Sequence, residues 1–195
     1  MPVNHGLSVP RILYNSLMPA SKLILLNGFA ASGKSTIAKR YIDNHPLALA
    51  VEGDTIIVNI GQWNAHEQEA RALMYTITRT LAATHLASGH DVVLPYLLTN
   101  PMHADAFKQL ALDSKASYYE VLLLDEKSVA VDRLIQRGSW GEPGLPPLTD
   151  SDLPVIGDLY DRMIEAAKGR DMITIRPSHG DIEGTYQELV RAIAH

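Results

Sequence analysis

The chain has 195 residues, a length that one compact domain accommodates. Hydrophobic residues make up 46% of it and charged residues 20%, which is typical of a soluble globular protein. With 17 basic and 22 acidic side chains and no long basic run, a nucleic-acid partner is not expected. The absence of cysteine excludes disulfides and thiolate metal sites and fits a cytoplasmic protein. We expect neither a signal peptide nor a membrane span.

Apolar runs of strand length alternate with longer segments of helical periodicity along the chain. This alternation predicts an α/β fold of three layers, with one parallel sheet covered by helices on both faces. Residues 1–21 are an expected N-terminal extension of a domain at 22–195, and the Gly- and Pro-rich segment 138–154 is an expected lid. In chain order, the predicted elements are a strand at 22–27, a helix at 34–42, a strand at 47–54, a helix at 64–88, a strand at 91–98, a helix at 100–115, a strand at 117–125, helices at 126–137 and 155–169, a strand at 171–175 and a helix at 181–194.

The longest predicted helix, 64–88, ends at Gly89, a residue that commonly terminates helices. Its apolar residues recur at helical spacing, which predicts one face turned toward the core. The residues expected on that face are Ala70, Leu73, Met74, Ile77, Leu81 and Thr84.

The segment "LLNGFAASGKSTIA", residues 25–38, contains the spacing G-x-x-x-x-G-K-S from Gly28 to Ser35. Glycines allow successive N–H groups to point inward, and the following helix adds its positive end to this anion-binding nest. We expect Lys34 to reach the β- and γ-phosphates of a nucleotide and the Ser35 hydroxyl to ligate Mg²⁺. An apolar strand before the loop and a helical pattern after it support this interpretation.

Asp54 ends the predicted strand 47–54, at the edge of the sheet where ligands of α/β proteins bind. A carboxylate there can accept the proton of an acceptor hydroxyl as general base, and it can hold Mg²⁺ through water. The alternative is that Asp54 only caps the next turn, as Asp often does.

The third predicted strand, 91–98, lacks the acid that usually holds Mg²⁺ in P-loop enzymes, and Pro95 lies near its end. Asp91 is at the wrong end of the strand, while Asp125 after the fourth strand either serves the metal or only caps a helix. This pattern argues against a motor and is compatible with a small-molecule kinase.

Several cationic and aromatic side chains are further candidates. Arg133 and Arg137 share a helix face before the lid, where closure could bring them to the transferring phosphate, or they belong to a solvated face. Arg71 either contacts solvent or reaches an anionic group of the substrate. Arg176 follows the last strand, where an adenine ring would lie.

Trp140, like Trp63, either lines a substrate pocket or anchors a loop. The eight histidines show no metal-binding spacing.

The P-loop, Asp54 and the arginine-bearing helix resemble P-loop small-molecule kinases, namely the chloramphenicol phosphotransferase-like, gluconate- and shikimate-kinase-like and zeta-toxin-like proteins. The segment Gly89–Leu97, which includes most of the third predicted strand, is similar to the third strand of bacterial AAA-domain ATPase or kinase proteins. The resemblance implies sheet order 2-3-1-4-5, ATP with Mg²⁺, and transfer of the γ-phosphate to a hydroxyl. Asp54 matches the acid after the second strand, although the gluconate-kinase histidine after it is absent. The residues matching the phosphate-binding loop are Gly28, Ala31, Ser32, Gly33, Lys34, Ser35 and Thr36.

The leading hypothesis is therefore an ATP-dependent phosphotransferase that acts on a hydroxyl of a small molecule. In it, Asp54 activates the acceptor, Lys34 and the lid arginines Arg133 and Arg137 neutralise the phosphates, and Ser35 holds Mg²⁺. The alternatives are a nucleoside or nucleotide kinase, and a nucleotide-binding regulatory switch with little turnover.

Overall fold

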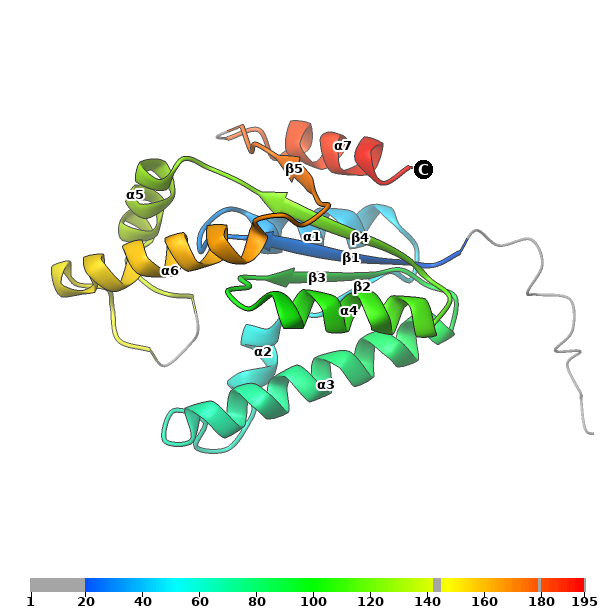
Figure 1. The fold of residues 1–195 in the computed structure, drawn as a ribbon, viewed down its shortest axis with the longest axis horizontal. Coiled ribbons are helices and arrows are strands. Elements are labelled where there is room, and N and C mark those ends of the chain that lie inside the picture. Colours follow the sequence, from blue (N-terminus) through cyan, green and yellow to red (C-terminus); the bar gives the residue numbers. More distant parts are fainter. Residues whose placement is uncertain (1–19, 142–144, 179, 195) are drawn as a thin grey trace, which may run out of the picture.

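The computed structural model describes residues 20–141, 145–178 and 180–194, so most of the predicted extension and the middle of the predicted lid lie outside the described residues. Five parallel strands form one sheet of order β2-β3-β1-β4-β5, which confirms the predicted fold class and strand order (Figure 1). The strands are β1 (Lys22–Gly28), β2 (Leu49–Ala50), β3 (Val92–Tyr96), β4 (Ser117–Leu123) and β5 (Ile173–Ile175).

Helices cover both faces of this sheet and complete the three layers (Figure 1). No helix in the described part of the chain has the length and apolar character needed to cross a membrane. The helices are α1 (Lys34–Asn44), α2 (Gly53–Ile57), α3 (Glu67–Ala87), α4 (Pro101–Asp113), α5 (Lys127–Arg137), α6 (Leu153–Ala167) and α7 (Ile182–Ala192), with a 3₁₀ turn at Asp150–Asp152.

The central strand β1 is buried on both faces because β3 and β4 flank it and helices cover it above and below. Alternate side chains point to opposite faces of a strand. Leu25 therefore packs in the cluster that contains Phe107 of α4, and Leu26 packs in the cluster that contains Tyr41 of α1. Burial on both faces explains why this segment is a continuous apolar run rather than an alternating one.

The second strand is shorter than predicted, since β2 ends at Ala50 and the chain enters α2 at Gly53. Gly53 allows a close approach, because a Cβ there would lie 2.4 Å from Met74 Sδ and 3.0 Å from the Tyr96 hydroxyl. Asp54 is consequently in the first turn of α2 and does not end a strand.

The face that α3 turns to the core differs from the predicted one. The buried residues recur every four positions, and the small Ala70, Thr78 and Ala82 among them allow the helix to pack closely. Ala70 and Met74 were predicted correctly, whereas the prediction was wrong for four residues, which are exposed: Leu73, Ile77, Leu81 and Thr84.

Two helices pack together at the carboxyl ends of the strands and flank the phosphate-binding loop. Phe29 of that loop contacts Tyr160 of α6 edge to face, with ring centroids 5.4 Å apart. The Tyr160 hydroxyl donates to the Asp125 carbonyl at 2.6 Å. α5 ends at Gly138, whose φ of 70° is left-handed, and the Leu148 N–H donates to the Gly138 carbonyl at 3.0 Å. This bond joins the first residue of the predicted lid, 138–154, to a residue in its second half.

Candidate nucleotide and acceptor site

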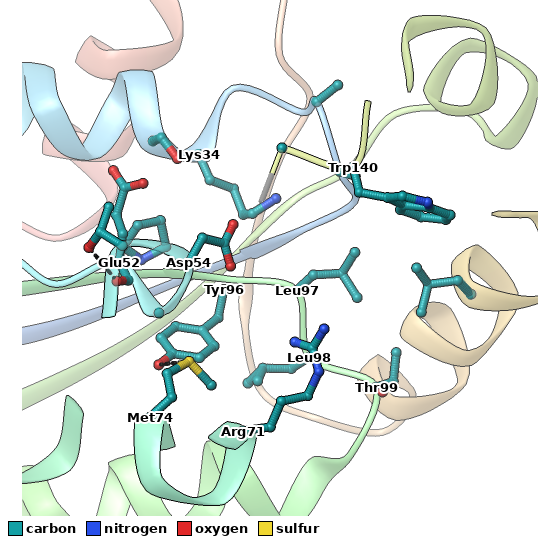
Figure 2. Close-up of a pocket in the computed structure, with 18 of the residues that line it drawn as sticks. Lys34, Glu52, Asp54, Arg71, Met74, Tyr96, Leu97, Leu98, Thr99 and Trp140 are labelled. Carbon is teal, nitrogen blue, oxygen red and sulfur yellow. Dashed lines mark hydrogen bonds between the residues drawn. The ribbon is translucent and has the colours of Figure 1, made fainter. Parts of the chain in front are cut away.

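A cavity of about 1560 Å³ lies at the carboxyl edge of the sheet (Figure 2). The phosphate-binding loop lines one part of it, together with the start of α2. The rest is lined by the first half of α3, the segment after β3, three residues of the predicted lid (Trp140, Gly141 and Leu145) and α6. Elements far apart in sequence therefore meet where open α/β sheets bind their ligands.

The phosphate-binding loop is shaped by its two glycines. A Cβ at Gly28 would lie 2.8 Å from Ser32 Oγ and 2.9 Å from the Leu123 carbonyl oxygen, so no larger residue fits there. Gly33 has a left-handed φ of 91° and precedes α1, and no side chain of the described chain caps that helix. Ala31 also has a positive φ, 60°. The first N–H groups of α1 are consequently available to an anion.

Asn27, the last polar residue before the loop, has a structural role that was not predicted from the sequence. Its buried side-chain oxygen accepts hydrogen bonds from the Gly28 N–H at 2.8 Å and the Leu98 N–H at 3.0 Å. The amide thereby joins the end of β1 to the segment after β3. A polar residue that closes an apolar strand directly before the loop is the signal that could have identified it.

Lys34 lies at the centre of the charged part of the cavity. Its ammonium donates to the Phe29 carbonyl at 2.6 Å and to Ser32 Oγ at 3.4 Å. Burial lowers the pKa of Lys34 to about 8; the carboxylate of Asp54 opposes this shift, and the Arg137 guanidinium adds to it. An anionic phosphate beside the ammonium favours its charged form and would raise the pKa again.

Asp54 and Lys34 project into the same part of the cavity, from α2 and α1 respectively (Figure 2). Behind Asp54, the Tyr96 hydroxyl forms a hydrogen bond with Thr78 Oγ1 at 2.9 Å. Burial, with a contribution from Asp54, raises the pKa of Tyr96 to about 12. Tyr96 therefore remains protonated near neutral pH, and the carboxylate is the basic group at this position.

The two arginines of α5 occupy different environments. Arg137 lines the cavity, and its guanidinium packs so closely on Gly141 that a Cβ there would lie 1.9 Å from it. Arg133 instead donates to Asp125 Oδ2 at 2.6 Å, and both side chains are largely buried, 27% and 8% exposed. Neither Arg133 nor the exposed Arg176 is among the described residues that line the cavity.

The structure places three residues whose roles the sequence left open. Trp140 lines the cavity, whereas Trp63 packs with Ile57 and Met74 in a buried cluster beneath α3 and anchors a loop. Arg71 lines the cavity from α3 and donates to Glu67 Oε1 at 2.9 Å.

A parallel sheet of order 2-3-1-4-5 with a phosphate-binding loop between β1 and α1 defines the P-loop nucleotide-binding class, in the form found in small-molecule kinases. The family model described as "AAA domain" matches residues 23–144, which is more than half of the chain. The protein therefore belongs to this P-loop AAA-domain family. The search of curated proteins finds no match.

Solved structures with the same fold are distant in sequence. APS kinase of Mycobacterium tuberculosis, in complex with AMPPNP and APS, is 17% identical with a TM-score of 0.59 over 91% of this chain and 99% of that chain. The tunicamycin resistance protein of Deinococcus radiodurans is 13% identical, with a TM-score of 0.61 over 89% and 95%. A Chloroflexus aurantiacus protein provisionally named a kinase is 16% identical, with a TM-score of 0.65 over 89% and 98%. These similarities establish the fold.

Proposed function

We propose that the protein is an ATP-dependent phosphotransferase that moves the γ-phosphate of ATP to a hydroxyl of a small molecule. The observation that carries this proposal is that Lys34 and Asp54 project into one cavity, a cation for the phosphates beside a base for the acceptor. The cavity volume of about 1560 Å³ also exceeds the roughly 300–1,000 Å³ of usual ligand pockets, which leaves room for a nucleotide and an acceptor.

In the proposed reaction, the loop N–H groups of residues 31–36 bind the phosphates, and the Lys34 ammonium neutralises their charge. The acceptor oxygen attacks the γ-phosphorus as the bond to the β–γ bridging oxygen breaks, and ADP leaves. The Asp54 carboxylate takes the proton of the acceptor hydroxyl. Arg137 is the arginine placed to stabilise charge on the transferring group.

The donor groups of this site fit Mg²⁺, which when bound would neutralise the β- and γ-phosphates. Ser35 lies exposed in the first turn of α1 and lines the cavity with Asp54 and Glu52. No group of three or more acidic or histidine side chains in the described part of the chain could hold a metal ion alone. Ser35 would therefore share the metal with phosphate oxygens and water, and Asp54 would act through water, as Mg²⁺ sites commonly do.

The remaining arginines receive indirect or peripheral roles in this proposal. Arg133 holds Asp125 and thereby fixes the start of α5, so it positions Arg137 and does not touch the phosphates. Arg176 follows β5, and we assign it the contact with the adenine ring that its place after the last strand predicts.

The test is phosphate transfer from γ-labelled ATP to a panel of small alcohols, sugars, nucleosides and amino alcohols. We expect a labelled product that requires both an acceptor and the protein. Lys34→Ala should abolish ATP binding, whereas Asp54→Asn should keep binding and lose roughly 10²–10⁴-fold in turnover. Asp132→Asn, an exposed acid of α5, is the matched control and should stay active. ATP binding without transfer to any acceptor, or full activity of Asp54→Asn, would contradict the proposal.

A further inference from the structure

One side of the cavity is largely apolar, although Arg162 of α6 also lines the cavity. The apolar residues come from three separate parts of the chain, namely the segment after β3, the predicted lid and α6, and they are Leu97, Trp140, Leu145, Val155 and Leu159. Figure 2 shows Leu97 and Trp140 on this side, while Glu52 and Asp54 lie on the other. The cavity therefore has a charged part and an apolar part.

The α6 residues on this side lie off the fully buried row of the helix, although Leu159 is partly buried and packs against the core cluster that contains Phe29 and Tyr160. The helix packs inward through Ile156, Tyr160 and Met163, which are buried. A different row, Val155 and Leu159, lines the cavity, and Val155 is 58% exposed. An apolar side chain left exposed at a cavity surface, as Val155 is, gains little stability from folding, and such surfaces commonly contact ligands.

The segment that follows β3 is also apolar where it lines the cavity. At the position where the sequence lacks an acid, Leu97 lines the cavity beside the phosphate-binding loop. A polyol placed here would lose hydrogen bonds to water without gaining partners from leucine and valine side chains, which is unfavourable. An apolar body would instead displace water from these surfaces, and the indole ring of Trp140 offers it a flat contact.

We propose, on the basis of the proposed function, that the acceptor is an alcohol whose hydroxyl is borne on an apolar, ring-sized body. The hydroxyl points to Asp54, and the body packs on Leu97, Trp140 and the Val155–Leu159 row of α6. Aromatic and alicyclic alcohols belong to this class, whereas sugars and other polyols do not.

The experiment compares 2-phenylethanol with glucose, because both carry a primary hydroxyl and they differ in the polarity of the body. Binding is followed by ligand-observed NMR with the full chain, in the presence of Mg²⁺ and the non-transferring analogue AMPPNP. We expect 2-phenylethanol to bind and glucose to show no binding. Transfer from γ-labelled ATP is then measured with the same two alcohols.

Two variants of α6 provide a matched pair. Val155→Ser should weaken 2-phenylethanol binding by roughly tenfold, since one lost apolar contact in a pocket has about this effect. Leu153→Ser should leave it unchanged, because Leu153 is also exposed, at 43%, but is not among the described cavity-lining residues. Unchanged affinity for AMPPNP in both variants shows that the nucleotide site is intact.

The outcomes separate this inference from the proposed function. Binding or phosphorylation of glucose in preference to 2-phenylethanol would overturn the inference and leave the kinase proposal standing. Binding of neither alcohol, or equal effects of Val155→Ser and Leu153→Ser, would also overturn it. Binding of 2-phenylethanol that depends on Val155, without transfer to any acceptor, would support the inference for the site and count against the kinase proposal.

Discussion

The environment of Lys34 predicts that nucleotide affinity falls as the pH rises through 8. In the nucleotide-free protein, burial lowers the pKa of this ammonium to about 8, and its nearest partner is the Phe29 carbonyl at 2.6 Å. Bound phosphates stabilise the charged form, so the pKa in the complex is higher than in the free protein. A cationic group whose pKa rises on binding stabilises the complex fully when the pH is below its pKa in the free protein. This stabilisation is lost as the pH rises through that value toward the pKa in the complex.

The size of the effect follows from proton linkage. Above the free-state pKa, forming the charged complex requires uptake of one proton, and the affinity declines by up to tenfold per pH unit. With a free-state pKa of about 8, the affinity for ATP with Mg²⁺ should be roughly tenfold weaker at about pH 9 than at neutral pH. Isothermal titration calorimetry in two buffers of different ionisation enthalpy would measure both the affinity and the proton uptake.

Lys34→Arg is the control, because a guanidinium remains charged across this pH range. The variant should bind ATP with little dependence on pH, whatever its absolute affinity. The reasoning would be refuted by a wild-type affinity that is flat between neutral pH and about pH 9, or by the same decline in Lys34→Arg.

Two further predictions concern ion pairs. Arg137→Ala should lower turnover by about 10²–10³-fold at unchanged stability. Arg133→Ala leaves the Asp125 carboxylate without this partner and should lower the free energy of unfolding, measured in urea, by about 2 kcal/mol. Equal losses of turnover in the two variants would contradict these roles. Glu120→Leu removes the bidentate partner of largely buried Arg170, at 2.7 and 2.8 Å, and leaves Arg170 its ion pair with Asp105 at 2.9 Å, so it should cost about 2 kcal/mol. Adding Arg170→Leu should restore most of this stability, and a further loss in the double variant would refute the reasoning.

The parts of the fold that depend on local sequence were predicted well. The strand, loop and helix from Lys22 to Asn44 follow directly from an apolar run, two spaced glycines and helical periodicity. The order of the strands came from the resemblance to P-loop kinases, because alternation of strands and helices alone predicts a parallel sheet without fixing its order.

The prediction failed where long-range packing decides between similar local patterns. α3 carries two apolar rows, and the row at Leu73, Ile77 and Leu81 is more hydrophobic than the row that is actually buried. Smaller residues on the buried row allow α3 to lie close to the sheet, a condition that periodicity does not report. Similarly, the close approach of Met74 and Tyr96 to Gly53, which leaves no room for a side chain there, is a tertiary contact that the sequence pattern does not report.

The spacing of Arg133 and Arg137 illustrates the same limit at the site. Residues four apart lie on one helix face, which made both arginines equal candidates for the phosphate. Asp125 at the carboxyl end of β4 distinguishes them, because its largely buried carboxylate accepts from Arg133 at 2.6 Å and leaves Arg137 to line the cavity. A pairing across eight residues depends on how α5 leaves the sheet, which the helix pattern does not show.

The absence of an acid after β3 affects two parts of the proposed reaction, namely which residues serve the metal and which contact the acceptor. With Leu97 at that position, the acidic side chains next to Lys34 come from the segment that enters α2, Glu52 and Asp54. One short segment would then provide both the base and the carboxylates nearest the metal, and Leu97, directly after β3, would contact the acceptor body. Leu97→Asp tests this division of roles. It should weaken binding of an apolar alcohol, because it places a charge on the apolar side, and it should leave ATP affinity within about threefold of wild type. A large loss of ATP affinity with unchanged alcohol binding would show that the end of β3 serves the nucleotide instead.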